Sequence, residues 1–130
     1  MLSRRNTLSY IAGFFDGEGS IYISGSKRQL FLGISITNTD LSVLQYIQKI
    51  IGGKISKSPD SRENTKKLFR LRLYSQEAKQ ILIELLPFLH TKKQQAYLVI
   101  EFQNDICRGK STLTFTQKMK YKKQLKEMKK

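Results

Sequence analysis

Cysteine, histidine and long apolar runs are scarce in this chain of 130 residues. The single cysteine, Cys107, excludes a disulfide within the chain, which favours a reducing, intracellular setting. The single histidine, His90, excludes sites that need several histidines, such as histidine-rich metal clusters. No apolar run is long enough for a signal peptide or a membrane span. We therefore expect Cys107 to fill the core and His90 to lie on a surface turn.

Acidic residues are also few: 10 Asp and Glu stand against 24 Lys and Arg, and the formal net charge is +14. Such an excess attracts polyanions, and nucleic acid is the first candidate. An anionic membrane surface is the second, but the basic tail at 118–130 has few large apolar residues to insert. A ribosomal or chromatin-like binder would share this charge, so charge alone does not imply catalysis. The length suits one compact domain, residues 1–130.

The hydrophobic pattern predicts an α+β domain of helices and two β-hairpins. Thr7, Asp40 and Ser75 are expected N-caps, because short polar side chains accept hydrogen bonds from the first amides of a helix. The expected elements are a loose basic arm at 1–6, a helix from 8 that ends within 16–19, strands at 21–24 and 30–37, a helix at 41–51, strands at 54–58 and 68–73, helices at 75–86 and 91–104, and a basic C-terminal segment at 108–130 that is helical over 115–128.

The first helix carries two features that are locally unfavourable. Gly13 lies in its middle, where glycine costs about 1 kcal/mol relative to alanine. Asp16 and Glu18 place acids at its C-terminal end, which is the negative end of the helix dipole. Local rules that are broken together often mark a functional site. Ala12 and Gly13 would let a second helix approach closely, and the acids can hold a cation; an ordinary surface turn is the alternative for the acids.

The segment from Tyr10 to Ser20, Y-I-A-G-F-F-D-G-E-G-S, resembles the motif of the LAGLIDADG homing endonucleases. Ala12, Gly13, Asp16 and Gly19 match the defining positions of that motif. The similarity covers almost the whole chain through the order of the elements. It implies the αββαββα fold of the family, with a saddle-shaped four-stranded antiparallel sheet, helices on one face and additional C-terminal helices.

The resemblance also implies a homodimer, because a single motif supplies one half of the active site. The motif helices of two copies would pack side by side. Asp16 is expected to tie down the partner's helix, and metal binding is its alternative. The interface residues implied by the resemblance are Ile11, Ala12, Gly13, Phe15 and Asp16.

Glu18 would then lie beside its symmetry mate at the floor of the DNA-binding surface. Two carboxylates so close repel unless cations lie between them. The resemblance adds the backbone carbonyl of Gly17 as a further ligand. Hard oxygen ligands favour Mg²⁺, with Mn²⁺ as a substitute and Ca²⁺ expected to bind without supporting cleavage. Metal there would activate a water molecule and stabilise the leaving oxygen.

Two further residues match catalytic positions of the family. Lys92, in a stretch that resembles the one carrying the family's active-site lysine, would act near the scissile phosphate; a solvated lysine at a helix start is the alternative. Asn38 falls where members often have Gln or Asn near the attacking water. A basic residue that some members have at the start of the second helix is missing, because Leu41 and Ser42 occupy that region.

The sheet of the family lies along the DNA major groove, and strand alternation divides the side chains of this chain between two faces. Facing the helices we expect Ile21, Ile23, Leu30, Leu32, Ile34, Ile36, Phe69, Leu71 and Leu73. Facing DNA we expect Ser20, Tyr22, Ser24, Ser26, Gln29, Phe31, Ser35, Lys54, Ser56, Ser58, Lys66, Arg70 and Arg72, with Lys27, Arg28 and Arg62 in hairpin loops that touch the flanks. Arg70 and Arg72 are the best candidates to read guanine or to bind phosphate, while an ordinary solvated face is the alternative for each single residue.

The resemblance implies a site-specific double-strand endonuclease, intron-encoded, that leaves short 3′ overhangs. Two copies of one surface would read a pseudo-palindromic site of roughly 20 base pairs. The alternatives are an RNA-splicing maturase, a DNA-binding regulator that has lost catalysis, and a basic ribosomal or structural nucleic-acid binder. Glu18 and Lys92 argue against lost catalysis, and the last alternative leaves the acids of the motif helix unexplained. The DNA target and the host, whether organelle, archaeon, bacterium or phage, stay open.

Overall fold

The computed structural model describes residues 3–26, 29–57, 67–106 and 114–129, and its elements follow the predicted order. They are α1 (Arg4–Glu18), β1 (Gly19–Ser26), β2 (Gln29–Asn38), α2 (Leu41–Ile51), β3 (Lys54–Lys57), β4 (Phe69–Tyr74), α3 (Ser75–Leu85), the 3-10 helix η1 (Leu86–Phe88), α4 (Lys93–Ile106) and α5 (Phe115–Met128). The predicted α+β class is confirmed. Cys107 lies outside the described residues.

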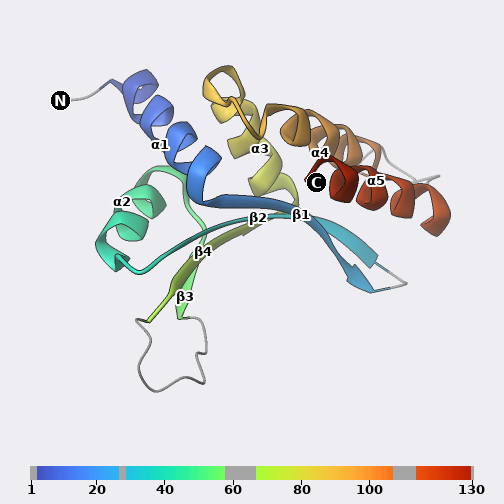
Figure 1. Cartoon of the computed structure of the whole chain (residues 1–130), viewed down its shortest axis with the longest axis horizontal. Coiled ribbons are helices and arrows are strands. Elements are labelled where there is room, and N and C mark those ends of the chain that lie inside the picture. Colours follow the sequence, from blue (N-terminus) through green and yellow to red (C-terminus); the bar gives the residue numbers. More distant parts are fainter. Residues whose placement is uncertain (1–2, 27–28, 58–66, 107–113, 130) are drawn as a thin grey trace.

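The four strands form one antiparallel sheet in the order β1-β2-β4-β3. The second strands of the two hairpins, β2 and β4, meet in the centre, so that β1 and β3 are the edges. Figure 1 shows the sheet as an arch, with the helices along its convex side and the concave face uncovered. No helix in the described part of the chain is both long and apolar enough to cross a membrane.

Strand alternation places one row of apolar side chains under the helices, as predicted. Ile21, Leu32, Ile34 and Leu71 each have at most 1% of their surface exposed. The alternating residues between them carry polar or aromatic side chains on the uncovered face. The sheet therefore has one face packed into the core and one face available to a partner.

The first helix begins earlier than predicted, because Ser3 and not Thr7 is its N-cap. The Ser3 hydroxyl accepts a hydrogen bond from the Asn6 amide, and the Ser3 carbonyl accepts one from the Thr7 hydroxyl. Arg4 makes an ion pair of 2.8 Å with Glu84 of α3. These contacts order residues 3–6 as a helical turn, so the predicted loose arm is wrong for this stretch.

The predicted caps of the two later helices have different outcomes. Asp40 caps α2 as predicted, through bonds that its carboxylate accepts from the Ser42 and Val43 amides. A hydrogen bond from the Ser42 hydroxyl, and then these backbone bonds, lower the pKa of Asp40. Ser75 is not a cap: β4 runs into α3 without a loop, so Tyr74 holds the N-cap position and no side chain caps this helix.

Candidate active site and nucleic-acid interface

The carboxylate of Glu18 stands at the junction between α1 and the sheet. Glu18 is the last residue of the helix, and Gly19 is both its C-cap and the first residue of β1. The side chain is exposed and makes no hydrogen bond or ion pair with any described residue. An exposed acid whose oxygens have no partner among the described residues is available to a ligand.

Asp16, two residues earlier, is fully engaged inside its own chain. Its carboxylate accepts hydrogen bonds from the His90 amide at 2.8 Å, the Lys92 amide at 3.1 Å and the Thr91 hydroxyl at 3.2 Å. These residues immediately precede α4, so the acid lies at the positive end of that helix dipole. These bonds give Asp16 a structural role within its own chain, and its contact with a partner's helix stays a prediction.

Lys92 reaches the same end of α1. Its ammonium donates to the backbone carbonyl of Asp16 at 2.6 Å, and the side chain is half-buried. A free carbonyl at the end of a helix is a good acceptor for a lysine. The fold therefore brings Lys92 within two residues of Glu18, although 74 positions separate them in sequence (92 − 18).

Asn38 ends β2 near the same junction. Gly19 pairs with Ile36, so the end of β2 that follows Ile36 runs beside the end of α1. The Asn38 side-chain oxygen accepts a hydrogen bond from the Asp40 amide at 2.8 Å and so shapes the turn into α2. That bond is a structural role in addition to the predicted catalytic one.

The uncovered face of the sheet carries polar rows across the strands. Ser20, Ser35, Arg72 and Lys54 form one row through successive pairing partners. A second row runs through Thr37, Arg70 and Ser56, in which Arg70 donates to the Thr37 hydroxyl at 3.4 Å. Paired residues of antiparallel strands project to the same side, so each row is one strip of surface.

Most predicted DNA-facing residues lie on this face. The exposed ones are Ser20, Gln29, Lys54 and Ser56, and the half-buried ones are Tyr22, Ser24, Phe31, Arg70 and Arg72. Ser35 is buried, with 8% of its surface exposed, because its short side chain lies on a central strand between larger neighbours. Ser35 therefore offers little surface, and its contact with DNA stays a prediction. The side chain of Ser26 and the residues Lys27, Arg28, Ser58, Arg62 and Lys66 lie outside what the structure describes.

An aromatic cluster on this face was only partly predicted. The Tyr22 ring covers Gly33, where a Cβ atom would overlap the ring, and Tyr74 packs edge-on against Phe31 with centroids 5.5 Å apart. Burial, and then the neighbouring Tyr74 hydroxyl, raise the pKa of Tyr22 to about 12, against a smaller lowering by the two arginines of β4. Tyr74 continues the alternation of Arg70 and Arg72, so the period of two was the signal that could have found it.

The face of α1 that could meet a partner differs from the predicted one. Ile11, Ala12 and Phe15 have no exposed surface, because they pack into the core of their own chain. The prediction of these three residues at a dimer interface is therefore wrong. Gly13 and Gly17 are exposed and have no atom within 4 Å of the position where a Cβ would stand.

The described residues hold no group of three or more His, Cys, Asp or Glu side chains that could bind a metal ion. Glu18 is the free carboxylate at the junction, and the carbonyl of Gly17 precedes it. Two such oxygens suit a hard cation but are too few to hold one alone. A metal site would need the same oxygens from a second copy, together with ligands from DNA or water.

The comparisons with known proteins agree with this geometry. The model of the LAGLIDADG endonuclease family matches residues 11–102, so the chain belongs to this family. No curated protein matches it.

Solved homing endonucleases share the fold. The archaeal intron-encoded I-Vdi141I, solved in complex with DNA, has a TM-score of 0.78 and 22% identity over 97% of this chain and 86% of its own. I-CvuI, in complex with its target and Ca, has a TM-score of 0.68 and 19% identity over 95% of this chain and 96% of its own. I-GzeII, in complex with its DNA target, has a TM-score of 0.65 and 19% identity over 93% of this chain but 43% of its own.

Proposed function

We propose that the chain is a homodimeric, site-specific endonuclease that cuts both strands of DNA with a divalent metal. The observation that carries this proposal is the free carboxylate of Glu18, at the end of the family motif and beside a sheet face that bears Arg70 and Arg72. Similar proteins with this fold have been solved bound to DNA targets. Glu18 has no partner among the residues that the structure describes and lies next to a basic face, so it could bind a cation that DNA phosphate also binds.

Dimerisation would complete the site. Gly13 and Gly17 stand four residues apart on the exposed side of α1, and small residues at this spacing let two helices approach closely. Such contact would bring the two copies of Glu18 together at the floor of the joint surface. The length of I-GzeII, of which this chain covers 43%, leaves room for a second unit of this size in one chain.

The donor set fits Mg²⁺ better than a softer metal, because it consists of carboxylate and carbonyl oxygens. Glu18 and the Gly17 carbonyl from each copy would hold the ions. A divalent metal bound there lowers the pKa of water and neutralises charge on the phosphate. Mn²⁺ is expected to substitute, whereas Ca²⁺ is expected to support binding only.

The other residues of the site would orient the attacking water and neutralise the charge of the phosphate. Lys92, fixed by the Asp16 carbonyl, would place a positive charge near the scissile phosphate. Asn38 would orient the attacking water through its amide group. The rows of the sheet face would enter the major groove, where Arg70 and Arg72 can donate to guanine or to phosphate.

The test is cleavage of a randomised double-stranded DNA library in Mg²⁺ by three proteins: wild type, Glu18→Gln and the control Glu77→Gln. Glu77 is an exposed acid in the first turn of α3, so its variant removes the same charge elsewhere. A randomised library is used because the sequence leaves the DNA target of this chain open.

Wild type and Glu77→Gln should enrich cuts at one long site with short 3′ overhangs. Glu18→Gln should fold normally and bind the same DNA but leave the DNA uncut. Removal of the metal should abolish cleavage by all three proteins. Tight, salt-sensitive binding without any cutting in Mg²⁺ or Mn²⁺ would overturn the proposal. The regulator or the maturase would then become the leading function.

A further inference from the structure

Helix α5 packs against β1, one of the two edge strands of the sheet. It contacts both α4 and the edge strand β1, with Leu125 buried at 3% exposure as its anchor. Figure 1 shows it along the outer side of the helix layer, next to α4. A hollow between this helix and β1 is lined by Tyr22, Ile23, Lys122, Leu125, Lys126 and Lys129. Since Tyr22 belongs to the uncovered face of the sheet, α5 borders that face directly.

The side of α5 at this border carries only positive charge. Lys122, Lys126 and Lys129 stand four and three residues apart, a spacing that puts them on one face of a helix. None of them makes an ion pair with an acid in the described parts of the chain. The acids Glu101 and Glu127 line a different groove, between α4 and α5.

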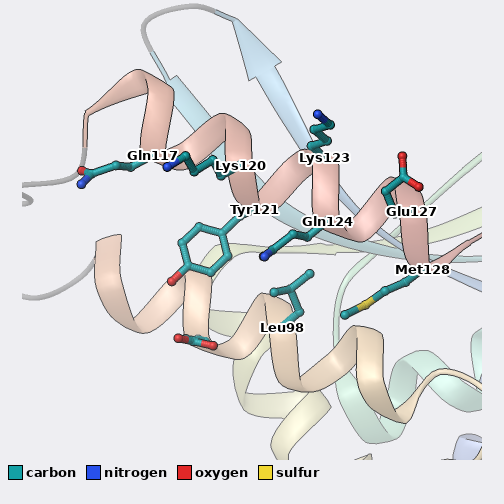
Figure 2. Close-up of a pocket in the computed structure, with 9 residues that line it drawn as sticks. Leu98, Gln117, Lys120, Tyr121, Lys123, Gln124, Glu127 and Met128 are labelled. Atoms are coloured by element: carbon teal, nitrogen blue, oxygen red, sulfur yellow. The ribbon is translucent and has the colours of Figure 1, made fainter.

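Two other lysines of the helix offer a contrast. Lys120 and Lys123 line the groove towards α4 together with those acids. Figure 2 shows Tyr121, Leu98 and Met128 between the two helices, while Lys123 and Glu127 point away from α4. All four lysines line a further hollow along α5, but only Lys122 and Lys126 also line the hollow that contains Tyr22 of the sheet face.

The lysine face of α5 ends beside the candidate active site. A second hollow of about 300 Å³ is lined by Gly19, Ser20, Ile21, Lys92, Gln95, Met128 and Lys129. Partial burial and the nearby ammonium of Lys92 lower the pKa of Lys129. The side-chain oxygen of Gln95 is buried without a hydrogen-bond partner among the described residues. The lining of this hollow includes two lysines and no acid, which favours an anionic ligand next to the junction that carries Glu18.

We propose that Lys122, Lys126 and Lys129 bind the phosphate backbone of DNA where it runs past the edge of β1, in continuation of the sheet face. This proposal depends on the proposed function in one respect only, namely that DNA is the ligand. The strand would follow the row of ammonium groups from Lys122 to Lys129, whose neighbour Lys92 stands at the active site. The contacts are to phosphate and so are independent of sequence.

The experiment measures the affinity for a random-sequence duplex over a range of salt concentrations, in EDTA so that no cleavage occurs. The double variant Lys122→Gln/Lys126→Gln is compared with the matched control Lys120→Gln/Lys123→Gln. Both remove two charges from the same helix and keep the length of the side chains. The single variant Lys129→Gln tests the end next to the active site.

Each lost phosphate contact lowers the slope of log K against log salt by about 0.9. The Lys122/Lys126 variant should therefore lower the slope by about 3.6 for two bound copies, and Lys129→Gln by about 1.8. The control should change it by less than about 1. Arginine at 122 and 126 should restore the slope, which separates lost charge from misfolding.

Equal slopes for the two double variants would overturn the proposal, since the helix would then act only through its overall charge. Because no metal is present, this outcome does not depend on cleavage. A chain that never cuts DNA can still show the slope change, and a chain that cuts normally can lack it. The proposed function and the α5 surface therefore fail separately.

Discussion

Asp16 and Glu18 stand two residues apart in one motif and differ in every contact that they make. Asp16 holds the turn before α4 through both carboxylate oxygens. Glu18 touches no described residue through a hydrogen bond or ion pair. The motif therefore combines an acid that is bound within the fold with an exposed acid, which we propose as the metal ligand.

This difference predicts opposite effects for two similar substitutions. Asp16→Asn should lower the free energy of unfolding by about 1–3 kcal/mol, because backbone amides and a hydroxyl lose a charged acceptor. Glu18→Gln should change it by less than about 0.5 kcal/mol, as is usual for an exposed residue without contacts. Chemical denaturation of both variants under the same conditions measures this. Equal stability of the two variants would contradict the assignment of Asp16 to the fold.

Tyr22 gives a prediction for alkaline pH. Its pKa is raised from 10.0 to about 12, so folding favours the neutral phenol. The stabilisation is complete below pH 10 and is lost as the pH rises through 12. The free energy of unfolding of the wild type should therefore fall more steeply between pH 10 and 12 than that of Tyr22→Phe. Denaturation at intervals across this range tests it, and parallel curves would refute it.

Helix α1 has two faces with different tasks. The apolar positions of its sequence recur at helical spacing, and Ile11, Ala12 and Phe15 are all buried in the core of the chain. The remaining surface exposes Tyr10, at 50%, beside the glycines at 13 and 17. A helix can serve a core and a partner at once only when different faces are used.

A substitution of Gly13 should affect the stability of the chain and its dimerisation in opposite directions. Alanine there meets no atom within 4 Å and should stabilise the isolated chain by up to about 1 kcal/mol, through helix propensity. The same methyl group should keep two α1 helices apart and weaken the dimer. Denaturation and sedimentation equilibrium measure the two effects on the same sample. A variant that is more stable and associates as tightly as the wild type would place the interface elsewhere.

At the scale of the whole molecule, charge and symmetry govern binding. Each chain has a formal charge of +14, so a pair carries +28 (twice +14). Two-fold pairing would extend the arched face of Figure 1 across a symmetry axis. The charge of the pair favours rapid but salt-sensitive association with DNA.

The expected complex contains two chains and one duplex. Its protein part should have twice the mass of a 15.1 kDa chain, about 30 kDa, by native mass spectrometry. Binding should weaken by about 10³–10⁵ between 50 and 200 mM salt if six to ten phosphates are contacted. One chain per duplex would be incompatible with a pseudo-palindromic site read by two copies.

Local patterns of the sequence determined the elements and the two faces of the sheet. The alternation of Leu71 and Leu73 with Arg70 and Arg72 separated core from surface, and the span of α5 was predicted to the residue. Asp40 was identified as a cap because its bonds reach only two and three residues along the chain. Such features depend on sequence neighbours, which a one-dimensional pattern contains. The resemblance of the motif located Glu18 and Lys92, and the geometry keeps them at one junction.

The tertiary structure decided which surfaces remain free. The partners of Asp16 lie 74 to 76 residues away, the burial of Ala12 depends on the whole helix layer, and Lys129 meets Lys92 only because α5 packs on α4 and β1. Ile11, Ala12 and Phe15 were misplaced at the interface for the same reason: small and apolar residues are equally suited to a core and to a partner helix. Only long-range packing determines which of the two they meet, and the sequence pattern is the same in both cases.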